Sequence, residues 1–156
     1  MLTLILPSEE QELLLAALRK AGRREVGGIL MGEHVGQNIF TVREMTVQGR
    51  GTFASFMRRI EDVIGSLKAF FRKTGHDYGR FNYIGEWHSH PSFAPYPSRT
   101  DDLSMLQIIQ DESVGANFAV LLIAKLGAEG ELVSTAHTYL PDGTRSASAV
   151  HLQTPN

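Results

Sequence analysis

The sequence predicts an α/β fold in which strands of a mixed β-sheet alternate with three helices. Three segments repeat apolar residues at helical spacing, and strand-like segments precede, separate and follow them. The most apolar segment, residues 117–126, is typical of a central strand that is buried on both faces. With 156 residues, of which 42% are hydrophobic and 21% charged, the chain is expected to form one domain over residues 1–156.

The N-terminal half predicts a strand, a helix, two strands and a second helix. Alternating leucines at residues 2–6 indicate a short first strand. Ser8 is expected to be the N-cap of a helix that ends near Gly22, because acidic residues follow Ser8 and basic residues precede the glycine. The next expected elements are strands at residues 28–31 and 38–47, a loop that leads into residues 53–57, and a helix at residues 58–73.

The C-terminal half predicts a third helix among four strands. Residues 81–87 are rich in strand-forming residues and precede a proline-rich loop. Ser98 is expected to begin the third helix, with Leu103, Leu106 and Ile109 as its apolar stripe. After the central strand, residues 131–140 are expected to pair with it, and residues 144–152 to form a last edge strand.

Two histidines in this half are placed to bind one metal ion. Residues i and i+2 of a strand point to the same face, about 6.5 Å apart, so His88 and His90 can converge. By the same alternation Glu86 shares their face and could orient an imidazole. Two imidazoles with the carboxylate of Asp101 suit zinc and leave a fourth position open, as in catalytic sites. The absence of cysteine excludes thiolate zinc sites, disulfides and a thiol nucleophile.

The spacing of these residues resembles a family signature. From His88 the sequence reads His-x-His, seven residues, Ser98, two residues and Asp101. Upstream, residues 25–32 read Glu-Val-Gly-Gly-Ile-Leu-Met-Gly. Both segments match the JAMM (MPN+) zinc metalloproteases at every fixed position, and the form around Glu86 is similar to the compact prokaryotic members. The resemblance implies an MPN (JAB1-like, cytidine-deaminase-like) domain with a curved mixed β-sheet flanked by helices.

The resemblance also implies a role for each motif residue. His88, His90 and Asp101 would bind zinc, Glu25 would act as general base and then general acid, and Ser98 would stabilise the oxyanion. Ser98 and Asp101 also fit a helix capping box, which is compatible with these roles because it would hold both side chains rigidly.

The implied activity is that of a zinc-dependent isopeptidase. It would cleave after the C-terminal glycine of a ubiquitin-like protein or its conjugate, with activating-like and conjugating-like enzymes as further partners. Two alternatives stay open: a non-catalytic MPN scaffold module, and a zinc peptidase or amidase acting on a carrier-protein tail or a small amide. Scaffold members typically lack the ligands, whereas this sequence retains all of them.

The charge and hydropathy of the chain restrict its location. A net charge of −2 provides no general attraction for nucleic acid or acidic membranes. No segment approaches the ~20 apolar residues of a membrane span, and the apolar start lacks the basic residues of a signal peptide. A cytoplasmic protein that binds neither nucleic acid nor membrane is therefore expected.

Overall fold

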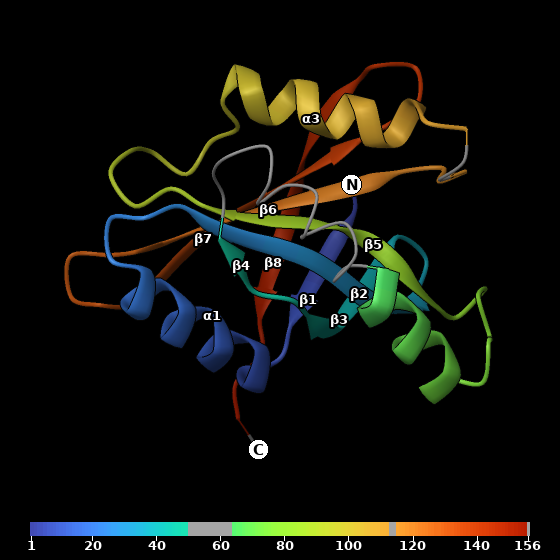
Figure 1. Cartoon of the computed structure of the whole chain (residues 1–156), viewed down its shortest axis with the longest axis horizontal. Coiled ribbons are helices and arrows are strands. Elements are labelled where there is room, and N and C mark those ends of the chain that lie inside the picture. Colours follow the sequence, from blue (N-terminus) through green and yellow to red (C-terminus); the bar gives the residue numbers. More distant parts are fainter. Residues whose placement is uncertain (50–63, 113–114, 156) are drawn as a thin grey trace.

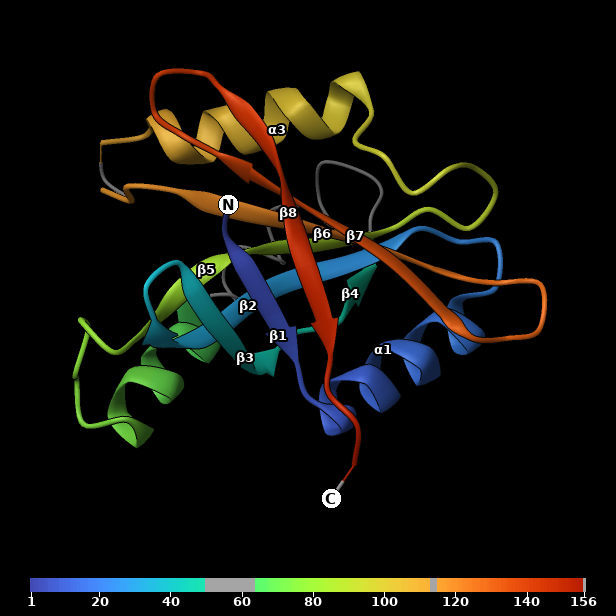
Figure 2. The same cartoon turned by 180° about the vertical axis from the view of Figure 1, so that it is seen from behind.

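Seven strands close into a barrel in the computed structural model, which describes residues 1–49, 64–112 and 115–155 (Figures 1 and 2). Around the barrel the strands follow the order β3–β1–β8–β7–β6–β5–β2, and β2 pairs back with β3. The short strand β4 pairs with β2 as well. The strands are β1 (Thr3–Leu6), β2 (Val26–Gly36), β3 (Ile39–Met45), β4 (Gln48–Gly49), β5 (Phe81–Ser89), β6 (Ala119–Leu126), β7 (Leu132–Tyr139) and β8 (Arg145–Leu152). The helices are α1 (Ser8–Ala21), α3 (Arg99–Gln110) and a helical segment at residues 64–73.

The closed barrel corrects the expected curved mixed sheet flanked by three helices, although the α/β class holds. Closure depends on β1, which lies between β3 and β8 and runs parallel to both. The expected edge strand at residues 144–152 is wrong for the same reason, because β8 is paired on both sides, with β7 and with β1. Helices α1 and α3 lie on opposite sides of the barrel (Figure 1), and Leu14 and Leu18 of α1 belong to the apolar cluster that the barrel encloses.

The interior of the barrel and the space beneath α3 hold separate apolar clusters. The residues of β6 alternate between them: Val120 and Leu122 belong to the larger cluster with Trp87, whereas Leu121 and Ile123 pack with α3. All four of these β6 side chains are fully buried, which confirms the predicted central strand. The indole N–H of Trp87 donates to the Thr46 carbonyl oxygen at 2.8 Å, so its one polar group is satisfied inside the core.

The helix ends differ in detail from the predictions. Helix α1 begins at Ser8 itself, with Pro7 at the N-cap position and no side-chain cap, whereas Gly22 ends the helix at a positive φ of 60° as expected. In α3, Met105 and Ile109 are buried but Leu103 is 56% exposed, so the predicted stripe is partly wrong. The first residues of the predicted helix at 58–73, and the segment at 53–57 before it, lie outside the described residues.

Candidate active site

A bulge in β5 directs the two histidines away from the barrel interior. Ile84 and Trp87 are three residues apart, yet both belong to the interior cluster, which strict alternation would not allow. The pairing of β5 with β2 shifts by one residue at Gly85, which has a φ of 152°. A Cβ atom on Gly85 would lie 1.8 Å from the Val120 carbonyl oxygen, so no other residue fits there without movement of the backbone. After the bulge, Trp87 faces inward and His88 faces outward.

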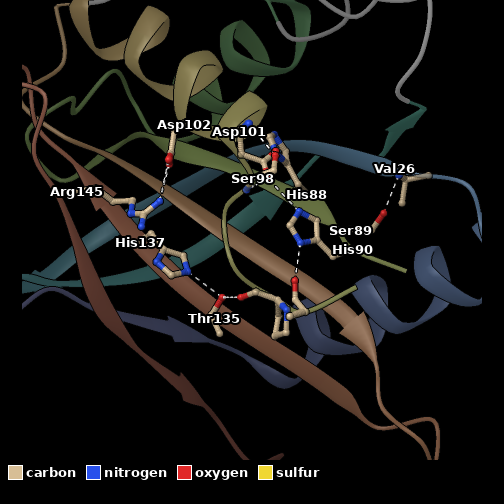
Figure 3. Close-up of polar contacts among 12 residues, drawn as sticks. Val26, His88, Ser89, His90, Ser98, Asp101, Asp102, Thr135, His137 and Arg145 are labelled. Carbon is tan, nitrogen blue, oxygen red and sulfur yellow. Dashed lines mark hydrogen bonds and ion pairs between the residues drawn. The ribbon is translucent and has the colours of Figure 1, made fainter. Parts of the chain in front are cut away.

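The carboxylate of Asp101 contacts both imidazoles (Figure 3). Its Oδ1 lies 2.8 Å from Nδ1 of His88, and its Oδ2 lies 3.0 Å from Nε2 of His90. Each of the three residues is 3% exposed. The structure therefore brings the three predicted ligands together from the end of β5 and the first turn of α3.

The start of α3 fixes the position of Asp101. The Ser98 hydroxyl accepts a hydrogen bond from the Asp101 backbone N–H at 3.1 Å, and the Asp101 carboxylate accepts one from the Ser98 backbone N–H at 2.9 Å. This reciprocal pair confirms the predicted capping box. Burial raises the pKa of Asp101, but the hydrogen bonds from His88 and from the Ser98 backbone outweigh burial and hold that pKa well below its usual range.

The hydrogen bonds of His90 define which of its nitrogens can bind a cation. Its Nδ1 lies 2.9 Å from the Ala94 carbonyl oxygen, and since a carbonyl only accepts, Nδ1 carries the hydrogen. In a neutral His90 the lone pair is then on Nε2, which faces an Asp101 oxygen at 3.0 Å. Two acceptor atoms this close favour a proton or a metal ion between them.

Glu25 reaches the same site from a distant part of the sequence. It is exposed and directly precedes β2, whose first residue, Val26, is bonded to β5 through Ser89. Four of the five predicted site residues line a pocket of about 170 Å³. The fifth, His88, contacts the pocket residue Asp101. The lining residues of the pocket are Glu25, His90, Phe93, Ser98, Thr100 and Asp101.

Comparison with known proteins assigns the family. The family model for prokaryotic homologs of the JAB domain matches residues 7–138. This chain belongs to that family.

Named relatives and a solved structure are similar to this JAB domain. A protein from Enterobacter hormaechei called CD-NTase/cGAS isopeptidase is 30% identical over 125 residues, which cover 78% of this chain and 66% of that protein. A protein of the same name from Vibrio cholerae is 32% identical over 91 residues, 58% of each chain. The chain thus spans less than two thirds of these relatives. The solution structure of DSY2949 from Desulfitobacterium hafniense has the same fold, with a TM-score of 0.65 and 20% identity over 97% of this chain and 94% of that one.

The three predicted ligands of this JAB domain are of the residue types that bind zinc, although their side chains contact each other directly. Within residues 1–49, 64–112 and 115–155, no group of three or more His, Asp or Glu side chains is spaced as a ready set of metal ligands. Instead, both imidazoles of the motif point a nitrogen at the same carboxylate. Two imidazoles and a carboxylate are a ligand set that zinc uses in catalytic sites. His88, His90 and Asp101 are therefore the residues that would hold the ion.

Some contributors to the pocket were not predicted from the sequence. Phe93 lines the pocket, and its ring centroid lies 4.4 Å from that of His90. The proline-rich loop has no periodicity from which this contact could be inferred. For Glu86 the structure shows no hydrogen bond to an imidazole in the described part of the chain, where His88 and His90 bond to Asp101 and the Ala94 carbonyl. The charge of Glu86 acts on Tyr83 instead, where burial first and this carboxylate second raise the pKa of the phenol.

No helix among the described residues is both long and apolar enough to cross a membrane.

Proposed function

We propose that this JAB domain is a zinc-dependent isopeptidase that hydrolyses the amide bond between a protein C-terminus and a lysine side chain. The observation that carries the proposal is the shared pocket of Glu25, His90, Ser98 and Asp101. It combines the exposed carboxylate of Glu25 with a buried imidazole and a buried carboxylate, which are groups that bind zinc. The family assignment supports the same class of reaction, because the pattern of donors and the upstream glutamate both match the family motif.

Glu25 is suited to move the proton in this reaction. A zinc ion at the site would act as a Lewis acid and make water acidic near neutral pH. The Glu25 carboxylate accepts a proton from the attacking water while the water oxygen bonds to the amide carbon. The same carboxyl group then donates that proton to the leaving nitrogen as the C–N bond breaks. The exposure of Glu25 at the pocket allows both transfers to a bound substrate.

The hydroxyl of Ser98 would stabilise the negative charge that develops on the carbonyl oxygen. Its hydroxyl oxygen accepts the Asp101 backbone N–H, and this contact uses a lone pair rather than the hydroxyl hydrogen. The O–H can therefore donate towards the pocket that Ser98 lines. Because the capping box holds Ser98 in place, the donor is positioned before the substrate binds.

The dimensions of the pocket and the names of the relatives suggest the substrate. A pocket of about 170 Å³ admits a narrow extended tail rather than a folded chain. The two curated relatives are called CD-NTase/cGAS isopeptidase, so a CD-NTase in an isopeptide linkage to a lysine is the first substrate to test. A ubiquitin-like protein with a C-terminal glycine is the second, since the sequence motifs imply it.

The test is a set of three amide substrates assayed with and without a metal chelator. They are a CD-NTase tail linked to the ε-amine of a lysine peptide, a ubiquitin-like tail linked in the same way, and a small acyl-lysine amide. Chelator-sensitive cleavage of at least one tail conjugate at the C-terminal residue is expected, with the small amide cut far more slowly. If only the small amide is cleaved, the activity is that of an amidase. If none is cleaved by zinc-loaded protein, the isopeptidase proposal is wrong and the scaffold alternative is favoured.

A further inference from the structure

Three successive backbone carbonyls in the loop after β5 each accept a hydrogen bond from a side chain, and the three side chains come from different parts of the sheet. The Phe93 carbonyl accepts from Nζ of Lys125 on β6 at 3.1 Å. The Ala94 carbonyl accepts from Nδ1 of His90, just after β5, at 2.9 Å. The Pro95 carbonyl accepts from the hydroxyl of Thr135 on β7. We call residues 93–95 the tethered segment. It has no helix or strand hydrogen bonds, although the Tyr96 N–H also donates to the Ala94 carbonyl at 2.8 Å within the loop. The hydrogen bonds from the three side chains attach the segment to the strands.

The hydrogen bond from Thr135 has a defined direction (Figure 3). A threonine hydroxyl has one hydrogen, and since the Pro95 carbonyl can only accept, that hydrogen is used there. Nε2 of His137 lies 3.0 Å from the same hydroxyl oxygen and must therefore be the donor in that contact. The bonds run in one direction, from His137 through Thr135 to Pro95. Such a chain polarises each member and strengthens the bond to the loop.

The tethered segment matters because its central carbonyl orients His90. Ala94 lies between the two residues that β6 and β7 hold, so its carbonyl stays directed at the His90 ring. That contact keeps the hydrogen on Nδ1 and the lone pair on Nε2, the atom that faces Asp101. If Pro95 were released, the Ala94 carbonyl could turn away and His90 could adopt the other tautomer or another ring angle.

We propose that Thr135 is a positioning residue of the site, which acts on His90 through the Pro95 and Ala94 carbonyls. Lys125 supports the same segment from its other end. The inference rests on the proposed zinc function, but Thr135 itself touches neither the substrate nor the ion. Neither sequence motif contains this residue.

The experiment compares Thr135→Val, Thr135→Ser and a matched control, Thr138→Val. Thr138 lies on the same strand and also has a hydrogen-bonded hydroxyl, but its partner is Ser148 on β8 at 2.6 Å rather than the loop. The first readout is the tautomer of His90, from ¹H–¹⁵N correlation spectra of the imidazole in metal-free protein. The second is the zinc dissociation constant, measured by competition with a chromogenic chelator. Far-UV circular dichroism and thermal melts report whether each variant is folded.

Thr135→Val is expected to weaken zinc binding by about 10- to 100-fold, the usual effect of losing a group that orients a metal ligand. It should also lower the population of the Nδ1–H form of His90. Thr135→Ser, which keeps the hydroxyl, and Thr138→Val should leave both readouts near wild type. Unchanged readouts in folded Thr135→Val, or a loss in Thr135→Ser equal to that in Thr135→Val, would overturn the proposal.

If Thr135→Val does not fold, Lys125→Met provides the same test from the other end of the tethered segment. A several-fold loss of zinc affinity with a shifted His90 tautomer would support the proposal, and unchanged values would overturn it. These readouts separate the inference from the isopeptidase proposal. Wild-type protein that binds zinc but cleaves no conjugate contradicts only the function, whereas the tautomer comparison tests Thr135 even in metal-free protein.

Discussion

The Ser89 hydroxyl accepts a hydrogen bond from the Val26 backbone N–H at 2.9 Å (Figure 3). Ser89 is 1% exposed and Val26 is 8% exposed, so this bond is shielded from water. Glu25 precedes Val26, and the two histidines flank Ser89 in the sequence. This buried bond thus extends the pairing of β2 with β5, which begins at Gly27 and His88, to the residue next to Glu25.

Ser89→Ala should destabilise the protein by about 1–3 kcal/mol, because the Val26 N–H would remain buried without its acceptor. Urea denaturation of the zinc-free protein measures this change in the free energy of unfolding. Ser8→Ala is the control, since the Ser8 hydroxyl does not cap α1, and it should stay within about 0.5 kcal/mol of wild type. Equal stability of Ser89→Ala and wild type would show that the bond contributes nothing.

Glu25→Gln should lower kcat by about 10²–10⁴-fold, because an amide of the same size cannot accept the proton of the attacking water. Zinc content and melting temperature should stay at wild-type values. Glu12→Gln, on the exposed face of α1, makes the same chemical change away from the pocket and should leave kcat unchanged. Wild-type rates in Glu25→Gln would assign the proton transfer to another group.

Purified protein is expected to contain one zinc ion per chain, and His88→Ala or Asp101→Ala should remove most of it. Two remaining protein ligands hold zinc poorly compared with three. Elemental analysis after dialysis against metal-free buffer provides the measurement. His151→Ala, an exposed histidine on β8, is the control and should retain the full content. Full occupancy in both site variants would rule out this ligand set.

Glu33 should make the stability of the protein depend on pH in the acid range. The buried carboxylate accepts hydrogen bonds from Arg43 at 2.8 Å and from Arg80 at 2.7 Å. The bond from Arg43, opposed by burial and aided by Arg80, lowers the pKa of Glu33 below its ordinary value of 4.5. Because the folded-state pKa is the lower one, this stabilisation is complete above pH 4.5 and is lost as the pH falls through the folded-state pKa.

Glu33→Gln removes this titrating group, so its free energy of unfolding should fall less than that of wild type as the pH drops below about 4.5. Urea denaturation over a pH series compares the two slopes, with Glu12→Gln as the exposed control. Parallel curves for wild type and Glu33→Gln would contradict the coupling.

The sequence predicts local geometry well where one element carries the relevant residues. His88 and His90 follow from alternation along a strand, and the Ser98–Asp101 pair follows from the capping box, which the structure confirms. The assigned roles of these residues stay predictions. Phe93 and Ala94 contact His90 through the fold of an irregular loop, so no local sequence pattern predicted these contacts.

The barrel was not predicted because its closure depends on pairings between remote segments. The alternation in residues 2–6 indicates a strand but says nothing about its neighbours. The bulge at Gly85 was also not predicted, since a glycine within a strand can mark a bulge, a bend or a close approach of another backbone. Without the bulge in view, the division of β5 into inward and outward residues could not be assigned.

The place of β1 in the barrel has a kinetic consequence. Leu4 lies opposite Phe40 on one side and opposite Val150 on the other, so the first strand of the chain pairs with the last one. Contacts between segments so distant in sequence are entropically costly to form, and folding slows as their share rises. Until β8 inserts between β7 and β1, both of those strands present unpaired backbone edges to other molecules. Refolding is therefore expected to be slow and sensitive to protein concentration, with insertion of β8 as the step that removes the exposed edges.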